Sequence, residues 1–91
     1  MTRVERIHAA LQAELAPIAL EVNDESHKHA GHAGARDGRG HFAVRVVSDA
    51  FAGLAPLARH RRVYAALGEM MQSDIHALSI HALTPLEAGA G

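Results

Sequence analysis

The sequence predicts one α+β domain of 91 residues with the element order α-β-β-α-β. Apolar residues recur at helical spacing in two segments and alternate with polar or small residues in three others. The expected helices cover residues 3–15 and 56–71, and the expected strands cover residues 18–23, 42–48 and 75–82. Because a helix joins the last two strands, we expect them to be parallel, with a right-handed crossover. The expected architecture is a three-stranded mixed sheet with both helices on one face.

The first helix has sequence signals at both ends. Thr2 and Glu5 have the spacing of a capping box, in which each side chain accepts a hydrogen bond from the other residue's amide. Pro17 cannot continue a helix. The residues between these signals form one apolar stripe, typical of a helix packed on a core: Val4, Ile7, Leu11 and Leu15.

The first two strands flank a long segment without periodicity. Apolar residues alternate with polar or small ones at Ile18, Leu20 and Val22, and again at Phe42, Val44 and Val46. Residues 24–40 between them are rich in Gly and His, which predicts a mobile loop. Since no helical pattern separates the two strands, we expect them to be antiparallel.

The second helix and the third strand follow. Pro56 suits the first turn of a helix, where its missing N–H is not needed. One arc of this helix is expected to face the core through Leu57, His60, Val63, Tyr64, Leu67, Met70 and Met71. In the third strand, Leu78 and Ile80 alternate with small or polar residues. Residues 84–87 fit one more helical turn, and residues 87–91 are expected to fray.

The composition narrows the classes of function. The chain has no Cys, which excludes disulfides and a self-contained thiolate metal site. Nine Lys and Arg against ten Asp and Glu disfavour tight, charge-driven binding of nucleic acid. No apolar run has the length of a membrane span or forms the core of a signal peptide, so we expect a soluble cytoplasmic protein. The sequence also lacks a Cys nucleophile, a phosphate loop and paired carboxylates, and this argues against an enzyme.

Eight His residues are the unusual feature of the composition. His76 is the second residue of the third strand, and more imidazoles precede or begin the second strand at His27, His29, His32 and His41. Imidazole is a common metal ligand, although a lone strand histidine also bonds backbone carbonyls and loop histidines are often only solvated. The His-x-His spacing is equally typical of a weak adventitious Zn²⁺ or Ni²⁺ site.

A second candidate surface is basic. Arg59, Arg61 and Arg62 lie together on the second helix. They form either a contact surface for DNA or an acidic partner, or a solvated helix face, which is the commoner role of such a run.

The order and spacing of several motifs resemble the BolA-like proteins. These motifs are Leu20–His27, His41–Phe42, Val47–Leu54, Arg59–Leu67, Ile75–His81 and Thr84–Pro85, and together they cover roughly residues 3–86. The resemblance implies an α-β-β-α-β fold with class II KH-like topology. It also implies binding to monothiol glutaredoxins, with which family members share a [2Fe-2S] cluster, and a part in iron homeostasis and cluster trafficking. Some bacterial members are described as transcriptional regulators of morphology and stress genes.

The resemblance also assigns residues. His76 matches the C-terminal ligand histidine of the family, and His29 lies where the His-type branch has its loop ligand, with His27, His32 and His41 as alternatives. Our hypothesis is that His76 and one of these histidines ligate one side of the cluster, while a glutaredoxin Cys and the glutathione thiolate ligate the other. Because imidazole ligates only when neutral, we expect the shared cluster to be lost near or below pH ~6. The isolated chain is expected to hold no cofactor and to be a monomer or a weak homodimer.

The runner-up function is DNA-binding transcriptional regulation through the helix around Arg59–Arg62. The sequence departs from the family pattern at one point, because the aromatic residue that usually follows Thr84–Pro85 is absent. What closes the C-terminal end onto the domain is therefore left open.

Overall fold

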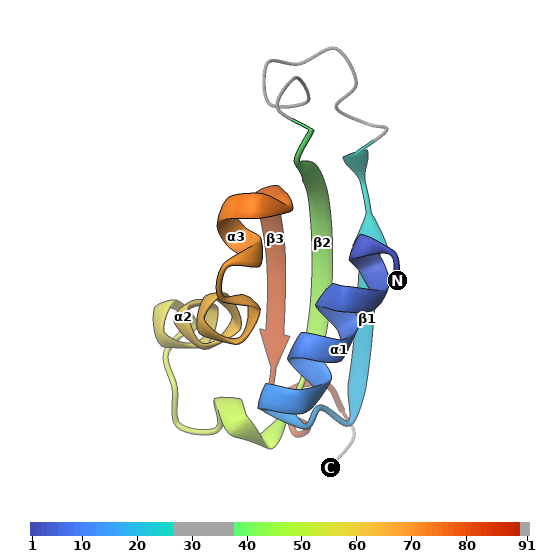
Figure 1. Cartoon of the computed structure of the whole chain (residues 1–91). Coiled ribbons are helices and arrows are strands. Elements are labelled where there is room, and N and C mark those ends of the chain that lie inside the picture. The colour runs from blue at the N-terminus through green and yellow to red at the C-terminus, as the bar shows by residue number, and fades with distance from the viewer. Residues whose placement is uncertain (27–37, 90–91) are drawn as a thin grey trace.

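The computed structural model describes residues 1–26 and 38–89. Along the chain, these residues form α1 (Arg3–Leu15), β1 (Ala19–Asp24), β2 (Gly40–Val47), the 3₁₀ turn η3 (Asp49–Phe51), α2 (Pro56–Leu67), α3 (Met70–Ser73) and β3 (Ile75–Leu83) (Figure 1). The predicted α+β class and element order are confirmed, with α3 as an addition. Most of the predicted loop, including His27, His29 and His32, lies outside the described residues.

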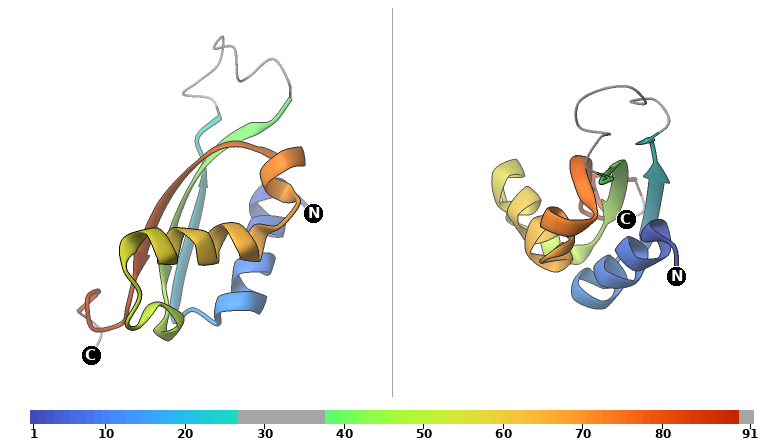
Figure 2. Two further views of the ribbon diagram at one scale, coloured as in Figure 1. Left: turned by 90° about the vertical axis from the view of Figure 1, so that its left-hand side faces the viewer. Right: turned by 45° about the horizontal axis from the view of Figure 1, so that its top comes forward.

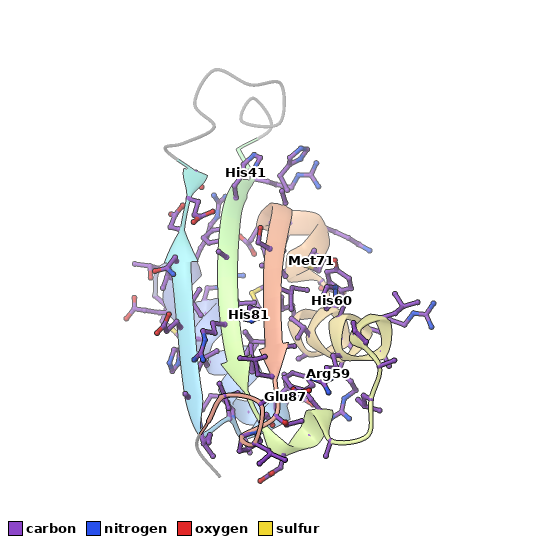
Figure 3. All side chains as sticks on the ribbon, turned by 180° about the vertical axis from the view of Figure 1, so that it is seen from behind. His41, Arg59, His60, Met71, His81 and Glu87 are labelled. Atoms are coloured by element: carbon purple, nitrogen blue, oxygen red, sulfur yellow. The ribbon has the colours of Figure 1, made fainter. Side chains whose placement is uncertain are left out.

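The sheet has the strand order β1-β2-β3. β1 and β2 are antiparallel, with Ala19 opposite Val47. β2 and β3 are parallel, with Val47 opposite Leu83. Figure 1 and Figure 2 show α1 and α2 on the same face of the sheet, as predicted. The other side, which carries no helix and which we call the open face, is turned toward the viewer in Figure 3.

α1 begins and ends where the local signals predicted. The Thr2 amide donates to Glu5 Oε1 (2.8 Å), and the Glu5 amide donates to Thr2 Oγ1 (3.1 Å), which completes the capping box. The helix ends at Leu15, and its C-cap residue Ala16, directly before Pro17, has a left-handed φ of 44°. Its buried residues belong to the predicted apolar stripe: Ile7, Leu11 and Leu15.

The core lies between the helices and the sheet. The alternation of β2 turns Phe42, Val44 and Val46 toward the helices. They pack with the buried residues of α1 and with Phe51, Val63, Leu67 and Ile75. Ser48 is buried beside this cluster, where its hydroxyl donates to the Leu15 carbonyl and accepts from the Ala50 amide (3.0 Å). The buried hydroxyl is therefore hydrogen-bonded and adds no desolvation penalty of its own.

The prediction of one helix over residues 56–71 is wrong, because the segment is broken. α2 ends at Leu67, and the chain passes through Gly68 at φ +56° before α3 begins at Met70. A positive φ ends a right-handed helix and suits Gly. The apolar spacing continued across the break because Met70 and Met71 still pack against the core.

The core-facing arc predicted for this helix is also too wide. Leu57 and Tyr64 are 61% and 41% exposed, whereas Val63 and Leu67 are buried. α2 packs against α1 and β3, so only its inward side meets the core.

The strand boundaries differ from the prediction by one or two residues. β1 begins at Ala19, and the side chain of Ile18 before it is 59% exposed. β2 begins at Gly40, which pairs with Ile75 of β3. Its last residue is Val47, because Ser48 is already the cap of η3.

Candidate metal-ligating site at the loop end of the sheet

A β-bulge sets the direction in which His76 points. Regular alternation would place His76 on the same side as Leu78, toward the helices. In the structure, two consecutive residues of β2 pair with Ile75 and then with Ala77, so β3 contains one extra residue at this point. Ile75 is buried and His76 is exposed. The bulge therefore presents the imidazole to solvent on the open face.

The packing of the core explains why the bulge is needed. Ile75 is buried and Leu78 packs against the core. Residues three apart cannot lie on one face of a regular strand, because its side-chain period is two. An extra residue between them lets both face the helices. The odd spacing of Ile75 and Leu78 is the sequence signal for the bulge.

His41 lies beside His76 on the open face. Their ring centroids are 5.3 Å apart and the ring planes are inclined by 51°. The backbone of His41 is held from the end of β1, because its amide donates to Ser26 Oγ (3.0 Å) and its carbonyl accepts from the Glu25 amide (2.7 Å). Figure 3 shows His41 at the start of β2. Of the five predicted ligand candidates, the structure brings these two together.

Arg39 contacts His76 and was not among the predicted ligand candidates. Its Nη2 lies 3.2 Å from His76 Nδ1. Gly38 and Gly40 on either side are anchored, since the Gly38 carbonyl accepts from Arg3 Nη2 (2.6 Å) and the Gly40 amide donates to the Asp74 carbonyl (2.9 Å). These anchors come from distant parts of the chain, so the local sequence around Arg39 gave no signal for the contact.

Position 40 admits no side chain in this backbone. A Cβ there would lie 2.6 Å from the Phe42 ring and 2.8 Å from Ser26 Oγ. Gly40 therefore lets the chain pass close to the core just before His41.

Asp74 links the site to α1. Its carboxylate accepts from Arg6 Nη2 (2.7 Å) and from Arg3 Nε (3.3 Å). The Arg6 guanidinium, followed by the Ser73 hydroxyl and Arg3, lowers the pKa of the Asp74 carboxyl against the opposing effect of burial. The first turns of α1 are thus tied to the turn that precedes β3.

The three predicted basic residues of α2 do not share one environment. Arg59 is turned inward: its side chain is 14% exposed, and its guanidinium donates to the carbonyls of Leu54 (2.7 Å) and Ala82 (3.2 Å) and to the Glu87 carboxylate. Arg61 and Arg62 are exposed. Whether any of the three contacts a partner stays a prediction.

Glu87 supplies the closing contact at the C-terminal end. Its carboxylate accepts from Arg59 and from the Thr84 amide (2.8 Å), and its own amide donates to Thr84 Oγ1 (3.2 Å). Arg59 and Glu87 lie side by side at the end of the sheet opposite His41 (Figure 3). An ion pair therefore holds this end of the chain, although the family's usual aromatic residue is absent.

The Glu87 contact should make stability depend on acid pH. Hydrogen bonds from Arg59, and then from the Thr84 amide, lower the pKa of the Glu87 carboxyl from 4.5 to about 2. A depressed carboxyl pKa contributes stability above the unfolded value, and this contribution is lost as the pH falls from 4.5 toward 2. We expect Glu87→Gln to lower Tm by roughly 1–5 °C at pH 7, because the contact is partly solvated.

The measurement for Glu87 is Tm by circular dichroism between pH 7 and 2.5. The difference between wild type and Glu87→Gln should shrink as the pH falls below 4. The control is Glu14→Gln, at an exposed position of α1. A difference between wild type and Glu87→Gln that is constant over the whole pH range would contradict the assigned role of the ion pair.

The open face also carries a shallow groove. It has a volume of about 210 Å³, lies beyond the histidine pair and is lined by Asn23, Ala43, Val44, Arg45, Ser79, Ile80 and His81. A groove so shallow and open does not enclose a small substrate. Among the helices in the described part of the chain, none has the length and apolar character that crossing a membrane requires.

The family model described as "BolA-like protein" matches residues 11–87. The chain belongs to the BolA-like family. The solved BolA domain of SufE1 from Arabidopsis thaliana matches this BolA-like chain with a TM-score of 0.84 and 46% identity, covering 96% of both chains. The solution structure of BolA1 from Mus musculus matches with a TM-score of 0.78 and 44% identity, over 94% of this chain and 68% of that one. The predicted BolA-like fold is confirmed, whereas membership of the family's His-type branch stays a prediction.

Two similar proteins carry names that bear on function. The "SufE-like protein 1, chloroplastic/mitochondrial" of Arabidopsis thaliana is 48% identical over 94% of this chain but only 24% of its own length. The "DNA-binding transcriptional regulator BolA" of Escherichia coli (strain K12) is 44% identical over 88% of this chain and 73% of its own length. The chain also spans 56% of "Protein BOLA1, chloroplastic" of Arabidopsis thaliana. The chain therefore spans between 24% and 73% of the length of these three relatives.

Proposed function

We propose that this BolA-like protein binds a monothiol glutaredoxin and shares a [2Fe-2S] cluster with it, in cluster trafficking or iron homeostasis. The observation that carries the proposal is the pair of imidazoles on the open face, whose ring centroids are 5.3 Å apart, in a chain that has no Cys. The cluster would be cargo held between two proteins, and the role of this chain would be non-enzymatic.

The residues present fit one side of such a cluster. Imidazole nitrogens ligate one iron of Rieske-type [2Fe-2S] centres, in which two His and two Cys complete the ligand set. Within residues 1–26 and 38–89, no group of three or more His, Asp or Glu side chains is arranged to hold a metal ion. At the loop end of the sheet, the described residues bring the imidazoles of His41 and His76 together. The thiolates would come from a glutaredoxin Cys and from glutathione.

The second imidazole ligand beside His76 has two candidate positions. His41 is its neighbour in space, and its backbone is hydrogen-bonded to Glu25 and Ser26, directly after β1. His29, with His27 and His32 as alternatives, is assigned by the family resemblance and lies outside the described residues. The proposal requires His76 and one of these four.

The open face gives a partner access to the site. His76 is exposed, and both long helices pack on the opposite side of the sheet (Figure 3). A second protein can therefore reach the imidazole without displacing a helix.

The test mixes this chain with a monothiol glutaredoxin, glutathione, ferrous iron and sulfide under anaerobic conditions. We expect visible absorbance and circular dichroism bands that differ from those of the glutaredoxin alone, and one complex of the two proteins by native mass spectrometry. Bands identical to those of the glutaredoxin alone, with no mixed complex, would overturn the proposal.

DNA-binding regulation is the second candidate function. α2 contains no acidic residue, and Arg61 and Arg62 are exposed on it. A surface with unopposed guanidinium groups attracts phosphates. The relative named as a DNA-binding transcriptional regulator supports the same candidate.

For this second function we expect Arg61→Ala/Arg62→Ala to weaken DNA binding roughly tenfold and to reduce its salt dependence by about one to two phosphate contacts. The measurement is a gel shift at several salt concentrations near the physiological value. Arg59 is left unchanged because its loss would also break the Glu87 ion pair. The control, Arg45→Ala, removes a cation from β2, in the groove of the open face. If both variants lose binding equally, α2 is not the contact surface.

A further inference from the structure

The contact between Arg39 and His76 determines where the imidazole proton lies. Arg39 Nη2 is 3.2 Å from His76 Nδ1. A guanidinium is always charged and has only donor hydrogens, so Nδ1 must accept with its lone pair. The contact with Arg39 therefore occupies Nδ1 and favours the tautomer with its proton on Nε2.

This arrangement is incompatible with metal ligation at either nitrogen of His76. A metal at Nδ1 would need the same lone pair that accepts from Arg39. A metal at Nε2 would require the proton to move to Nδ1, where it would face the N–H groups of Arg39. In both cases the guanidinium has to leave first.

We propose that Arg39 is a blocking residue for His76, which caps Nδ1 in the free protein and withdraws when a metal centre is bound. The inference rests on the proposed function for the identity of that centre, a [2Fe-2S] cluster shared with a glutaredoxin. The competition itself applies to any ion that binds imidazole.

The backbone around Arg39 is built to hold this contact. Gly38 is held by Arg3 from α1, and Gly40 is held by the Asp74 carbonyl. Asp74 in turn binds both Arg3 and Arg6. The Cα of residue 39 is therefore placed by helix α1 and the turn before β3, while the long side chain retains its own rotatable bonds. Withdrawal requires a change of side-chain rotamer and no change of fold.

The blocking contact makes metal capture conditional. A lone metal ion must displace a charge-assisted hydrogen bond and approach a cation at the same time, and both effects lower its affinity. A partner that presents an acidic group to Arg39 would remove the block as it docks. The imidazole of His76 would then be available to a metal mainly within the mixed complex.

The test uses the full chain without glutaredoxin, with Zn²⁺ as the probe. Imidazole ¹⁵N shifts of His76 report which nitrogen carries the proton, and their change during a Zn²⁺ titration gives an affinity for that residue separately from the other histidines. In wild type we expect the Nε2–H form. In Arg39→Gln we expect a mixture of both tautomers and Zn²⁺ binding at His76 that is about three- to tenfold tighter.

The matched control is Arg45→Gln, which removes an equal charge from the middle of β2 on the open face, where His81 is its cross-strand neighbour. It should leave the tautomer and the affinity at His76 unchanged. If Arg45→Gln acts as strongly as Arg39→Gln, the effect is one of general charge and the proposal is overturned. It is also overturned if Arg39→Gln changes neither the tautomer nor the Zn²⁺ titration of His76.

The result is separable from that of the proposed function. If Arg39→Gln shifts the tautomer and the Zn²⁺ affinity while wild type forms no complex with a glutaredoxin, the block stands and the cluster-sharing proposal falls. If the mixed complex forms but His76 in the free chain lacks the Nε2–H form, the block falls and cluster sharing stands.

Discussion

His76→Ala should abolish the visible absorbance and circular dichroism of the cluster shared with a monothiol glutaredoxin. The reason is that His76 is the exposed member of the imidazole pair and is turned to the open face by a bulge. Without it, the described residues leave one imidazole, that of His41, at the loop end of the open face. The spectrum should then revert completely to that of the glutaredoxin with glutathione alone. The measurement is a titration of the preformed glutaredoxin cluster with wild type or variant.

His81→Ala is the matched control for this experiment. His81 is another exposed histidine of β3, and it lines the groove of the open face beyond the pair. Its removal should leave the mixed spectrum unchanged. Far-ultraviolet circular dichroism of both variants should match that of wild type, because neither side chain contributes to the core. A His76→Ala variant that is folded and still gives the wild-type mixed spectrum would contradict the ligand assignment.

His41→Ala extends the same experiment to the second ligand. Complete loss of the mixed spectrum would assign His41 beside His76. Retention would leave the role to His29 or one of its neighbours, which His29→Ala would then test. Either result is compatible with the proposed function, and together they complete the ligand set.

Phe51→Ala should cause the largest loss of stability among the substitutions considered. Phe51 is 0% exposed and belongs to the core cluster. Truncating a buried Phe removes its burial and leaves a cavity, which together cost about 3–5 kcal/mol. A domain of this size has a free energy of unfolding of about 5–15 kcal/mol, so the variant should be marginally folded.

The measurement for Phe51 is urea unfolding followed by circular dichroism. Leu57→Ala is the control, because Leu57 is 61% exposed on α2 despite its apolar character. We expect it to change the free energy of unfolding by no more than about 0.5 kcal/mol. A Leu57→Ala loss as large as that of Phe51→Ala would show that the assigned core is wrong.

The sequence predicted those features of the fold that local chemistry determines. The bounds of α1 follow from Thr2, Glu5 and Pro17, all within or next to the helix. The strands followed from alternation, and their order followed from the helix between the last two. The break at Gly68 was missed because the apolar spacing of the methionines continued across it.

The candidate site was predictable only in part, because its geometry depends on distant contacts. His76 and His41 were both named from the sequence, and the structure places them together. The regular alternation assumed for β3 would have turned His76 inward, since it ignored the odd spacing of two core residues. Arg39 was missed because its position depends on anchors from α1 and from Asp74. The inward turn of Arg59 likewise depends on Glu87, far along the chain.

The bulge in β3 couples ligand presentation to the hydrophobic core. Ile75 and Leu78 must both pack inward, and an odd spacing forces the intervening pair of residues outward together. The packing of these two apolar residues is enough to turn the imidazole of His76 to the open face, and no polar interaction is needed for it. A lineage that drifts in surface sequence would retain the orientation of His76 for as long as it retains those two apolar positions. Inserting or deleting a single residue between them would disturb that orientation more than most substitutions.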